Sequence, residues 1–156
     1  MKKAEELLER ARARGAEIAT AESCTGGMIA AAITDPPGAS DIFATGYVTY
    51  SNAAKERLLG VSADTLRLHG AVSEPVAREM AEGALHGSGA TLAIAVTGIA
   101  GPGGSEFKPE GRVCFGLAGT GRVTRTETVE FGAIGRGNVR AGTVEHALSM
   151  LIAALG

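Results

Sequence analysis

The segment TLAIAVT at residues 91–97 constrains the fold of this chain more than any other feature. It is a nearly continuous apolar run, which is typical of a β-strand whose two faces are both covered by other parts of the protein. Residues 16–21, AEIATA, form a second short run of small and β-branched residues and predict another buried strand. Two buried strands require helices on both faces of a sheet, which is the layering of an α/β protein.

The rest of the chain supplies the helices and strands that this layering needs. Helices are predicted over residues 2–14, 28–34, 53–59 with Asn52 as the cap, after Ser62, from Ser73 to about Leu85, and from about Asn138 to Ala154. Strands are predicted over residues 43–50, 112–118 and 123–131, the last two as a hairpin around Gly119–Gly121. We therefore expect one domain over residues 1–156, a three-layer α/β/α sandwich with a mixed sheet.

Charge and composition exclude several classes of protein. The formal net charge is −2, and no run of lysine and arginine gives the footprint of a nucleic-acid-binding protein. Cys24 and Cys114 are too few for a disulfide framework, and the three histidines have no second ligand at helical spacing, so we expect neither a metal nor another cofactor. The N-terminal segment has no apolar signal core, and the longest apolar stretch, residues 28–33, is too short to span a membrane. We expect a cytoplasmic protein that binds neither nucleic acid nor membrane.

Ser23 lies in a polar, glycine-containing turn, ESCTGG at residues 22–27, between a predicted strand and a predicted helix. This turn presents backbone N–H groups at a helix N-terminus, where negative charge is favoured, and is a suitable setting for an exposed nucleophile. The turn also suits a serine that only caps the helix. It is not a G-x-S-x-G elbow, and the scattered histidines offer no clear member of a Ser-His-Asp triad.

Lys55 is a candidate base for Ser23, because a serine without a histidine can be activated by a lysine. It lies in the first turn of the predicted helix that follows Tyr50. The positive end of the helix dipole and burial would both lower its pKa, as a lysine needs if it is to act as a base at neutral pH. The plain alternatives are a solvated helix lysine and, for Tyr50, a strand residue packed on the core.

Two further segments could contact an anion. The loop Gly98–Ser105 could donate backbone N–H groups to an oxyanion or a phosphate, but it matches neither a Walker A motif nor G-x-G-x-x-G and also suits a surface loop. Arg136 and Arg140 lie at the start of the last helix, where a cation is unfavourable unless an anion neutralises it. Surface ion pairs would also explain both arginines.

Four strings cover much of the chain: TAESCTGG (20–27), GYVTYSNAAKERLLGV (46–61), HGAVSEPVAREMAEGAL (69–85) and VTGIAGPGGSEFKPEGRVCFG (96–116). Together they closely resemble the CinA C-terminal domain family, the nicotinamide-nucleotide amidases, in the family's own order. The resemblance implies an α/β/α sandwich that hydrolyses nicotinamide mononucleotide to nicotinate mononucleotide and ammonia without a metal. Many members carry a separate N-terminal domain, and this chain is similar to the stand-alone amidases.

The resemblance also implies roles for individual residues. Ser23 is expected to be the nucleophile and Lys55 its base, with Tyr50 as a further catalytic residue. The expected substrate-binding residues are Thr25, Gly26, Gly27, Thr97, Gly98 and Arg140. Backbone N–H groups near Gly26–Gly27 or near Thr97–Gly98 would hold the oxyanion, and Arg140, alone or with Lys108, would hold the nucleotide phosphate.

One departure from the family concerns the string before the last helix. Relatives often have a Gly-Asp-Arg-Asp-like string there, whereas this chain has Gly135-Arg136-Gly137-Asn138, so the role of Arg136 stays open. Two other functions also stay open: a non-catalytic nucleotide-binding or regulatory module, and an amidase for another small amide. Many small apolar residues and the resemblance make us expect a homo-oligomer.

Overall fold

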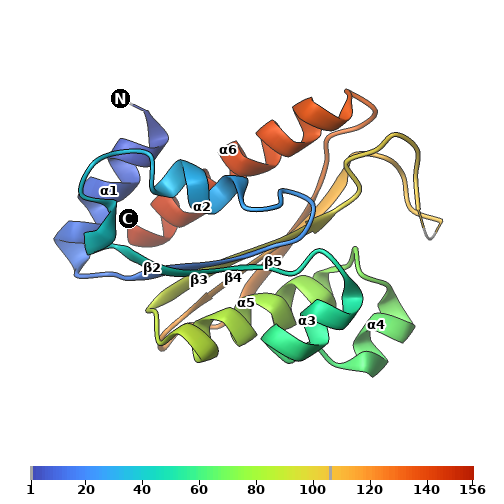
Figure 1. Cartoon of the computed structure of the whole chain (residues 1–156), viewed down its shortest axis with the longest axis horizontal. Coiled ribbons are helices and arrows are strands. Elements are labelled where there is room, and N and C mark those ends of the chain that lie inside the picture. Colours follow the sequence, from blue (N-terminus) through green and yellow to red (C-terminus); the bar gives the residue numbers. More distant parts are fainter. Residues whose placement is uncertain (1, 106) are drawn as a thin grey trace.

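Within residues 2–105 and 107–156, which the computed structural model describes, five strands form one mixed sheet in the order β2-β1-β3-β4-β5. Helices α1, α2 and α6 cover one face of this sheet, and α3, α4 and α5 cover the other (Figure 1). The predicted three-layer α/β/α sandwich is therefore confirmed. In chain order, the elements are α1 (Lys3–Arg14), β1 (Ile18–Glu22), α2 (Met28–Ile33), a 3-10 turn (Ala39–Asp41), β2 (Phe43–Val48), α3 (Asn52–Leu59), α4 (Ala63–His69), α5 (Glu74–Ser88), β3 (Leu92–Gly98), β4 (Arg112–Gly119), β5 (Arg125–Glu130) and α6 (Arg136–Leu155).

Strand β3 shows why the two faces of the sheet differ. Its large side chains, Leu92, Ile94 and Val96, belong to the core under α1, α2 and α6. Its alanines, Ala93 and Ala95, belong to the core under α5. Since successive side chains of a strand point to opposite faces, the alternation within the apolar run makes one face bulky and the other flat. The flat face lets the helix α5 lie close to the sheet.

The order of the strands decides where a ligand can bind. Strand β1 pairs in parallel with β2 on one side and with β3 on the other, while β4 is antiparallel to both β3 and β5. The chain therefore leaves β1 toward β2 and then crosses to the opposite side of β1 to form β3. Ligands of open α/β sheets bind outside the carboxyl ends of the strands at such a reversal. In this chain, that point is the end of β1, where Ser23 follows Glu22.

The ends of three helices differ from the predicted ones. The prediction that Asn52 caps α3 is wrong, because the Oγ atom of Ser51 accepts the N–H of Ala54 at 3.1 Å and Asn52 is already helical. Helix α5 continues to Ser88, beyond the predicted end, and α6 begins at Arg136, before the predicted start. Glycines with positive φ stand at the observed ends: Gly89 follows α5 with φ of 72°, and Gly135 precedes α6 with φ of 97°.

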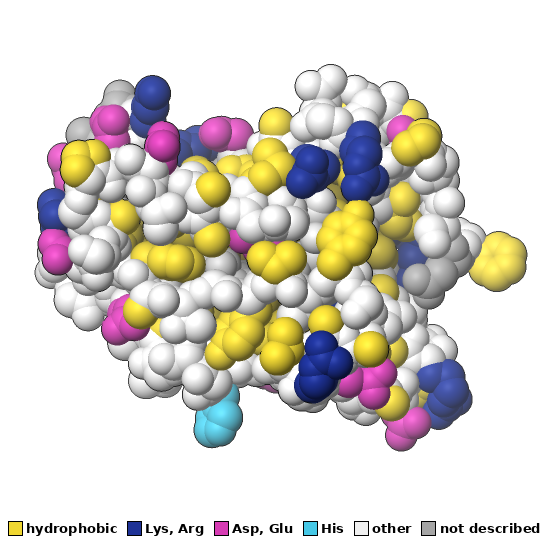
Figure 2. Space-filling model, viewed as in Figure 1, with side chains coloured by type: hydrophobic (Ala, Val, Ile, Leu, Met, Phe, Trp, Pro, Cys, Tyr) yellow, Lys and Arg dark blue, Asp and Glu magenta, His cyan; other side chains and the backbone are white. Residues whose placement is uncertain are grey.

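One of the two edges of the sheet is uncharged. Strand β2 forms this edge and carries no charged residue, and the side chain of Val48 at its end is 49% exposed. In the face viewed in Figure 2, hydrophobic side chains gather across the middle of the molecule, where this strand lies in Figure 1. No helix within the described ranges combines the length and the apolar character that crossing a membrane requires.

Candidate active site

A cavity of about 330 Å³ lies at the carboxyl ends of β1 and β3, where the strand order reverses. This volume is within the range of small-molecule sites, about 300–1,000 Å³. The residues that line it come from four segments: Ser23 and Cys24; Tyr50, Asn52 and Lys55; Ala71 and Val72; and Thr97–Ser105, with Arg136 from α6. Lys55 and Arg136 are basic, and no aspartate or glutamate of the described residues is in the lining, so the cavity suits an anionic ligand.

Ser23 is held at the floor of this cavity by the neighbouring strand. It directly follows β1, and its N–H donates to the carbonyl of Val96 in β3 at 3.1 Å. Ser23 is only 8% exposed, yet it is among the residues that line the cavity. The backbone of Ser23 thus continues the sheet, which fixes the point from which its side chain leaves the backbone.

Lys55 reaches Ser23 from α3. Its Nζ atom lies 3.0 Å from the Oγ of Ser23 and donates to the carbonyl of Thr49 at 2.9 Å. The side chain is 1% exposed, and burial lowers the pKa of Lys55 below its ordinary value. Among the described residues, no carboxylate forms an ion pair with it, so the charged form is stabilised only by neutral acceptors. The arrangement favours a neutral amine beside a serine hydroxyl.

Cys24, the neighbour of Ser23, is also buried and lines the cavity. The pKa of the Cys24 thiol is raised from its ordinary 9.0 to about 11, chiefly by burial and in smaller part by the negative charge of Glu22, against the opposing effects of a backbone hydrogen bond and the positive charge of Arg140. A thiol with this pKa is protonated at neutral pH, and a protonated thiol is a poor nucleophile. The local chemistry therefore favours Ser23 over Cys24 as the nucleophile.

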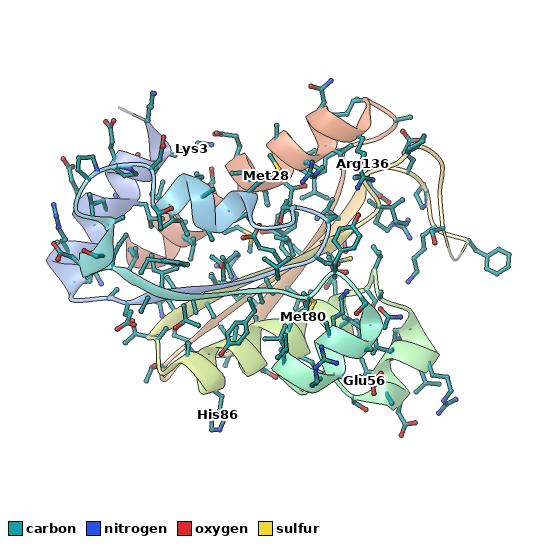
Figure 3. The ribbon with its side chains drawn as sticks, in the orientation of Figure 1. Lys3, Met28, Glu56, Met80, His86 and Arg136 are labelled. Atoms are coloured by element: carbon teal, nitrogen blue, oxygen red, sulfur yellow. The ribbon has the colours of Figure 1, made fainter. Side chains whose placement is uncertain are left out.

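Arg136 and Tyr50 meet at the mouth of the cavity. The guanidinium of Arg136 donates to the hydroxyl of Tyr50 at 2.9 Å and to the carbonyl of Gly101 at 2.8 Å. Figure 3 places Arg136 at the N-terminal end of α6, beside the long loop that follows β3. Tyr50 is 61% exposed, so its hydroxyl faces the solvent side of the cavity rather than the core. The two side chains form one wall around the opening.

Gly98 offers a backbone N–H to the same cavity. The carbonyl of Val96 points toward β1, because it accepts the N–H of Ser23. Residues two apart on a strand direct their backbone groups to the same side, so the N–H of Gly98 points past the end of β1, toward Ser23. A Cβ atom at this position would lie 2.7 Å from Val113 Cγ2, which explains a glycine here. The hydroxyl of the preceding Thr97 donates to the carbonyl of Ala71 at 2.9 Å.

Other predicted site residues lie around the cavity rather than in its lining. Thr25, Gly26 and Gly27 belong to the turn below Ser23, where the N–H of Gly26 donates to the carbonyl of Ser23 and that of Gly27 to the carboxylate of Glu22. Arg140 also holds this turn, since its guanidinium donates to the carbonyls of Cys24 and Thr25 at 3.0 and 3.3 Å. These groups are already occupied in the structure, and they shape the turn.

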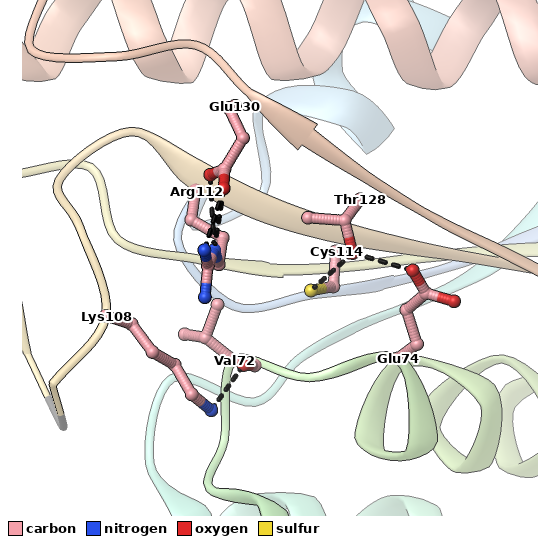
Figure 4. Close-up of polar contacts among 7 residues, drawn as sticks. All are labelled: Val72, Glu74, Lys108, Arg112, Cys114, Thr128 and Glu130. Carbon is pink, nitrogen blue, oxygen red and sulfur yellow. Dashed lines mark hydrogen bonds and ion pairs between the residues drawn. The ribbon is translucent and has the colours of Figure 1, made fainter.

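Lys108 fastens the loop after β3 to the segment before α5. Its ammonium donates to the carbonyls of His69 and Val72, as Figure 4 shows for Val72. The same view shows Glu74 at the start of α5 accepting the hydroxyl of Thr128 in β5. Lys108 therefore connects two segments that line the cavity, because Val72 and Gly101–Ser105 both belong to the lining.

Two contributors were not identified from the sequence. The carbonyl of Thr49 orients Lys55, and no side-chain pattern could reveal a backbone carbonyl. Glu22 is fully buried beneath the turn, and an acidic residue just before a helix is a signal that could have indicated it. Within residues 2–105 and 107–156, no group of three or more His, Cys, Asp or Glu side chains is arranged to hold a metal ion.

Comparison with known proteins gives matches over most of the chain. A family model described as the CinA C-terminal domain matches residues 1–155. Nicotinamide-nucleotide amidohydrolase PncC of Enterobacter agglomerans is 60% identical over 114 residues, which cover 72% of this chain and 70% of that protein. A CinA-like protein of Anaeromyxobacter dehalogenans is 50% identical over 151 residues, covering 96% of this chain and 36% of that protein.

Solved structures are similar over nearly the whole chain. The competence/damage inducible protein CihA from Agrobacterium tumefaciens has a TM-score of 0.90 and 46% sequence identity, and the match covers 98% of this chain and 96% of that one. Against four of the curated relatives, by contrast, the chain spans only 27% to 36% of their length.

Proposed function

This chain belongs to the CinA C-terminal domain family, and from that premise we propose that it is an amidohydrolase that converts nicotinamide mononucleotide to nicotinate mononucleotide and ammonia. The observation that carries the proposal is the buried pair of Ser23 and Lys55, with 3.0 Å between Oγ and Nζ at the floor of the cavity. A relative of 60% identity is named as a nicotinamide-nucleotide amidohydrolase, which supports the choice of substrate.

Lys55 acts as the base in the proposed reaction. A neutral amine has two hydrogens and one lone pair, so Lys55 can keep its bond to the carbonyl of Thr49 while its lone pair accepts the proton of Ser23. The Oγ atom then attacks the carboxamide carbon, which forms a C–O bond and moves the carbonyl electrons onto oxygen. The lowered pKa of Lys55 makes the neutral form available.

The N–H of Gly98 is the proposed donor to the oxyanion. Of the two pairs of backbone groups predicted for this role, the N–H groups of Gly26 and Gly27 are already bonded, whereas Gly98 points toward Ser23. One such donor is typically worth about 2.7–4 kcal/mol. When the C–N bond breaks, protonated Lys55 gives its proton to the departing nitrogen, and ammonia leaves. Water, deprotonated by Lys55, then hydrolyses the ester and frees Ser23.

Arg136 is the proposed partner of the nucleotide phosphate. Arg136 lines the cavity and donates to the carbonyl of Gly101, whereas Arg140 and Lys108 are outside the lining, where the Arg140 guanidinium and the Lys108 ammonium donate to backbone carbonyls. An arginine at the start of α6 is unfavourable without an anion, and within the described residues no carboxylate forms an ion pair with Arg136. Backbone N–H groups of the Gly101–Ser105 loop would add to the binding of a phosphate.

Ammonia release by the purified protein tests the proposal. We expect release from nicotinamide mononucleotide, much less from nicotinamide, and none from the Ser23→Ala variant. Release from simple amides but not from the nucleotide would instead indicate an amidase for another small amide. Nucleotide binding without any release would indicate a non-catalytic binding module.

The homo-oligomer expected from the sequence stays a prediction. The uncharged edge strand β2 and the exposed Val48 at its end support association between copies of the chain. Light scattering coupled to size exclusion should give a mass above that of one chain, and a monomer at micromolar concentration would contradict the prediction.

A further inference from the structure

From the contacts beneath the nucleophile, and resting on the proposed function, we infer that Glu22 is a positioning residue that fixes Ser23 against Lys55. Glu22 is the last residue of β1 and is 0% exposed, and its carboxylate is outside the lining of the cavity. It therefore cannot touch the substrate. A buried carboxylate is kept in a fold only when donors satisfy it.

Four donors converge on the carboxylate of Glu22. Its Oε1 atom accepts the hydroxyl of Thr25 at 2.5 Å and the N–H groups of Gly27 and Ile29 at 3.2 and 2.9 Å. Its Oε2 atom accepts the N–H of Ala30 at 3.0 Å. All four donors follow Ser23 in the chain, so the turn that carries Ser23 closes back onto the residue before it.

This carboxylate also replaces the missing cap of α2. The helix has six residues, begins after Gly27 without a side-chain cap, and has no acidic residue in its first turn. Such a short helix is not stable by itself. The carboxylate of Glu22 accepts N–H groups of the first turn, as a capping side chain would, and its negative charge lies at the positive end of the helix dipole.

Glu22 is connected to both partners of the candidate catalytic pair. Ser23 follows it directly, and the carbonyl of Ser23 accepts the N–H of Gly26 within the same turn. On the other side, the carbonyl of Glu22 accepts the N–H of Thr49 at 2.8 Å, and the carbonyl of Thr49 holds the Nζ atom of Lys55. A shift of Glu22 would therefore change the distance between Ser23 and Lys55, to which proton transfer is sensitive.

The chain contains a matched control for this arrangement. Glu79 accepts the N–H of Ser62 at 2.7 Å and the hydroxyl of Thr65 at 2.6 Å, at the start of α4. The chemistry is the same, a glutamate that holds a helix N-terminus and a threonine hydroxyl, but neither Glu79 nor α4 lines the cavity. Glu79→Gln should lower thermal stability and leave turnover by the folded protein unchanged.

The test compares Glu22→Gln with Glu79→Gln. Glutamine keeps the size of the side chain but has one acceptor oxygen, so at least one of the four donors loses its partner. We expect kcat of Glu22→Gln to fall by about 10²-fold, as for a displacement of about 1 Å, with KM for nicotinamide mononucleotide and the pH midpoint unchanged. A fluorophosphonate reagent that labels Ser23, followed by mass spectrometry, should react more slowly by a similar factor.

A second variant covers the case in which Glu22→Gln does not fold. Thr25→Val removes one of the four donors without changing the charge, and kcat and the labelling rate should fall while KM stays constant. The inference is overturned if the folded variants turn over and are labelled at the wild-type rate, with only their melting temperature reduced as in Glu79→Gln.

The labelling measurement separates this inference from the proposed function. If the wild-type protein releases no ammonia but Ser23 is labelled in a way that depends on Glu22, the inference stands and the proposed function fails. If the wild type hydrolyses the nucleotide and Glu22→Gln does so equally well, the function stands and the inference fails. A wild-type protein that neither hydrolyses an amide nor is labelled at Ser23 would overturn both.

Discussion

Replacement of Cys24 by alanine should preserve turnover, while replacement of the adjacent Ser23 by alanine should abolish it. The two side chains are neighbours in one turn, both line the cavity, and Lys55 lies near both. Cysteine is intrinsically the stronger nucleophile, so the assignment depends on which of the two groups the environment activates.

The fraction of Cys24 that is ionised sets the expected rate of its alkylation. At pH 7.5, a thiol of pKa 9.0 is about 3% thiolate, whereas a thiol whose pKa has been raised to about 11 is about 0.03% thiolate. Alkylation of Cys24 in the folded protein should therefore be about 100-fold slower than alkylation of an ordinary cysteine, before any steric protection from burial. Cys24→Ala should cost at most about 1–2 kcal/mol of stability through the lost buried sulfur.

The raised pKa of Cys24 also gives a pH signature of stability. The folded-state pKa lies above the unfolded one. The contribution of the thiol to the free energy of unfolding is therefore complete below about pH 9 and is lost as pH rises toward about 11. The stability of the wild type relative to Cys24→Ala should fall by about 1–2 kcal/mol between pH 8 and pH 10. The lowered pKa of Lys55 acts in the opposite direction in both proteins, so the wild type is compared with Cys24→Ala rather than followed alone.

Three measurements check the assignment. Ammonia release compares the two alanine variants, iodoacetamide labelling at pH 7.5 gives the rate at Cys24, and urea unfolding at pH 8 and pH 10 gives the stability difference. The reasoning is refuted if a well-folded Cys24→Ala is inactive while Ser23→Ala still turns over. Rapid alkylation of Cys24 that parallels inactivation would point the same way.

Three further predictions concern the base, the anion and the metal. Lys55→Arg keeps the positive charge but cannot lose its proton, so kcat should fall by about 10²–10⁴-fold, and a variant of near wild-type turnover would remove lysine from the mechanism. In the wild type, kcat/KM should rise with pH at a midpoint below the ordinary lysine pKa. Arg136→Ala should raise KM for nicotinamide mononucleotide by about 10- to 150-fold, corresponding to about 1.5–3 kcal/mol for a charge-assisted hydrogen bond, and should leave KM for nicotinamide riboside unchanged; equal effects on both substrates would contradict contact with the phosphate. Activity should survive dialysis against a chelator, and loss that one divalent ion restores would overturn the serine-lysine scheme.

Local patterns in the sequence were enough to predict the elements that carry the site. The apolar run at 91–97 became the buried strand β3, and the alternation around residues 119–121 became the hairpin of β4 and β5. The polar turn after β1 placed Ser23 at a strand end, and the first turn of α3 placed Lys55 after β2. These predictions depend on periodicity, glycine and capping, which are properties of residues close together in the chain.

Only the tertiary structure decided how these segments meet. Ser23 and Lys55 are 32 residues apart, and their contact depends on the parallel pairing of β1 with both β2 and β3, which no local signal specifies. The two arginines of α6 illustrate the same limit. One helical turn separates them, yet Arg136 reaches the cavity and Arg140 holds the turn below Ser23, because the docking angle of α6 on the sheet sets where each side chain ends. Glu22 was visible in the sequence as an acid before a helix, but its four donors converge only when the turn is folded. The sequence therefore determined which chemical groups lie at the strand ends, and packing between distant segments determined which of them face one another.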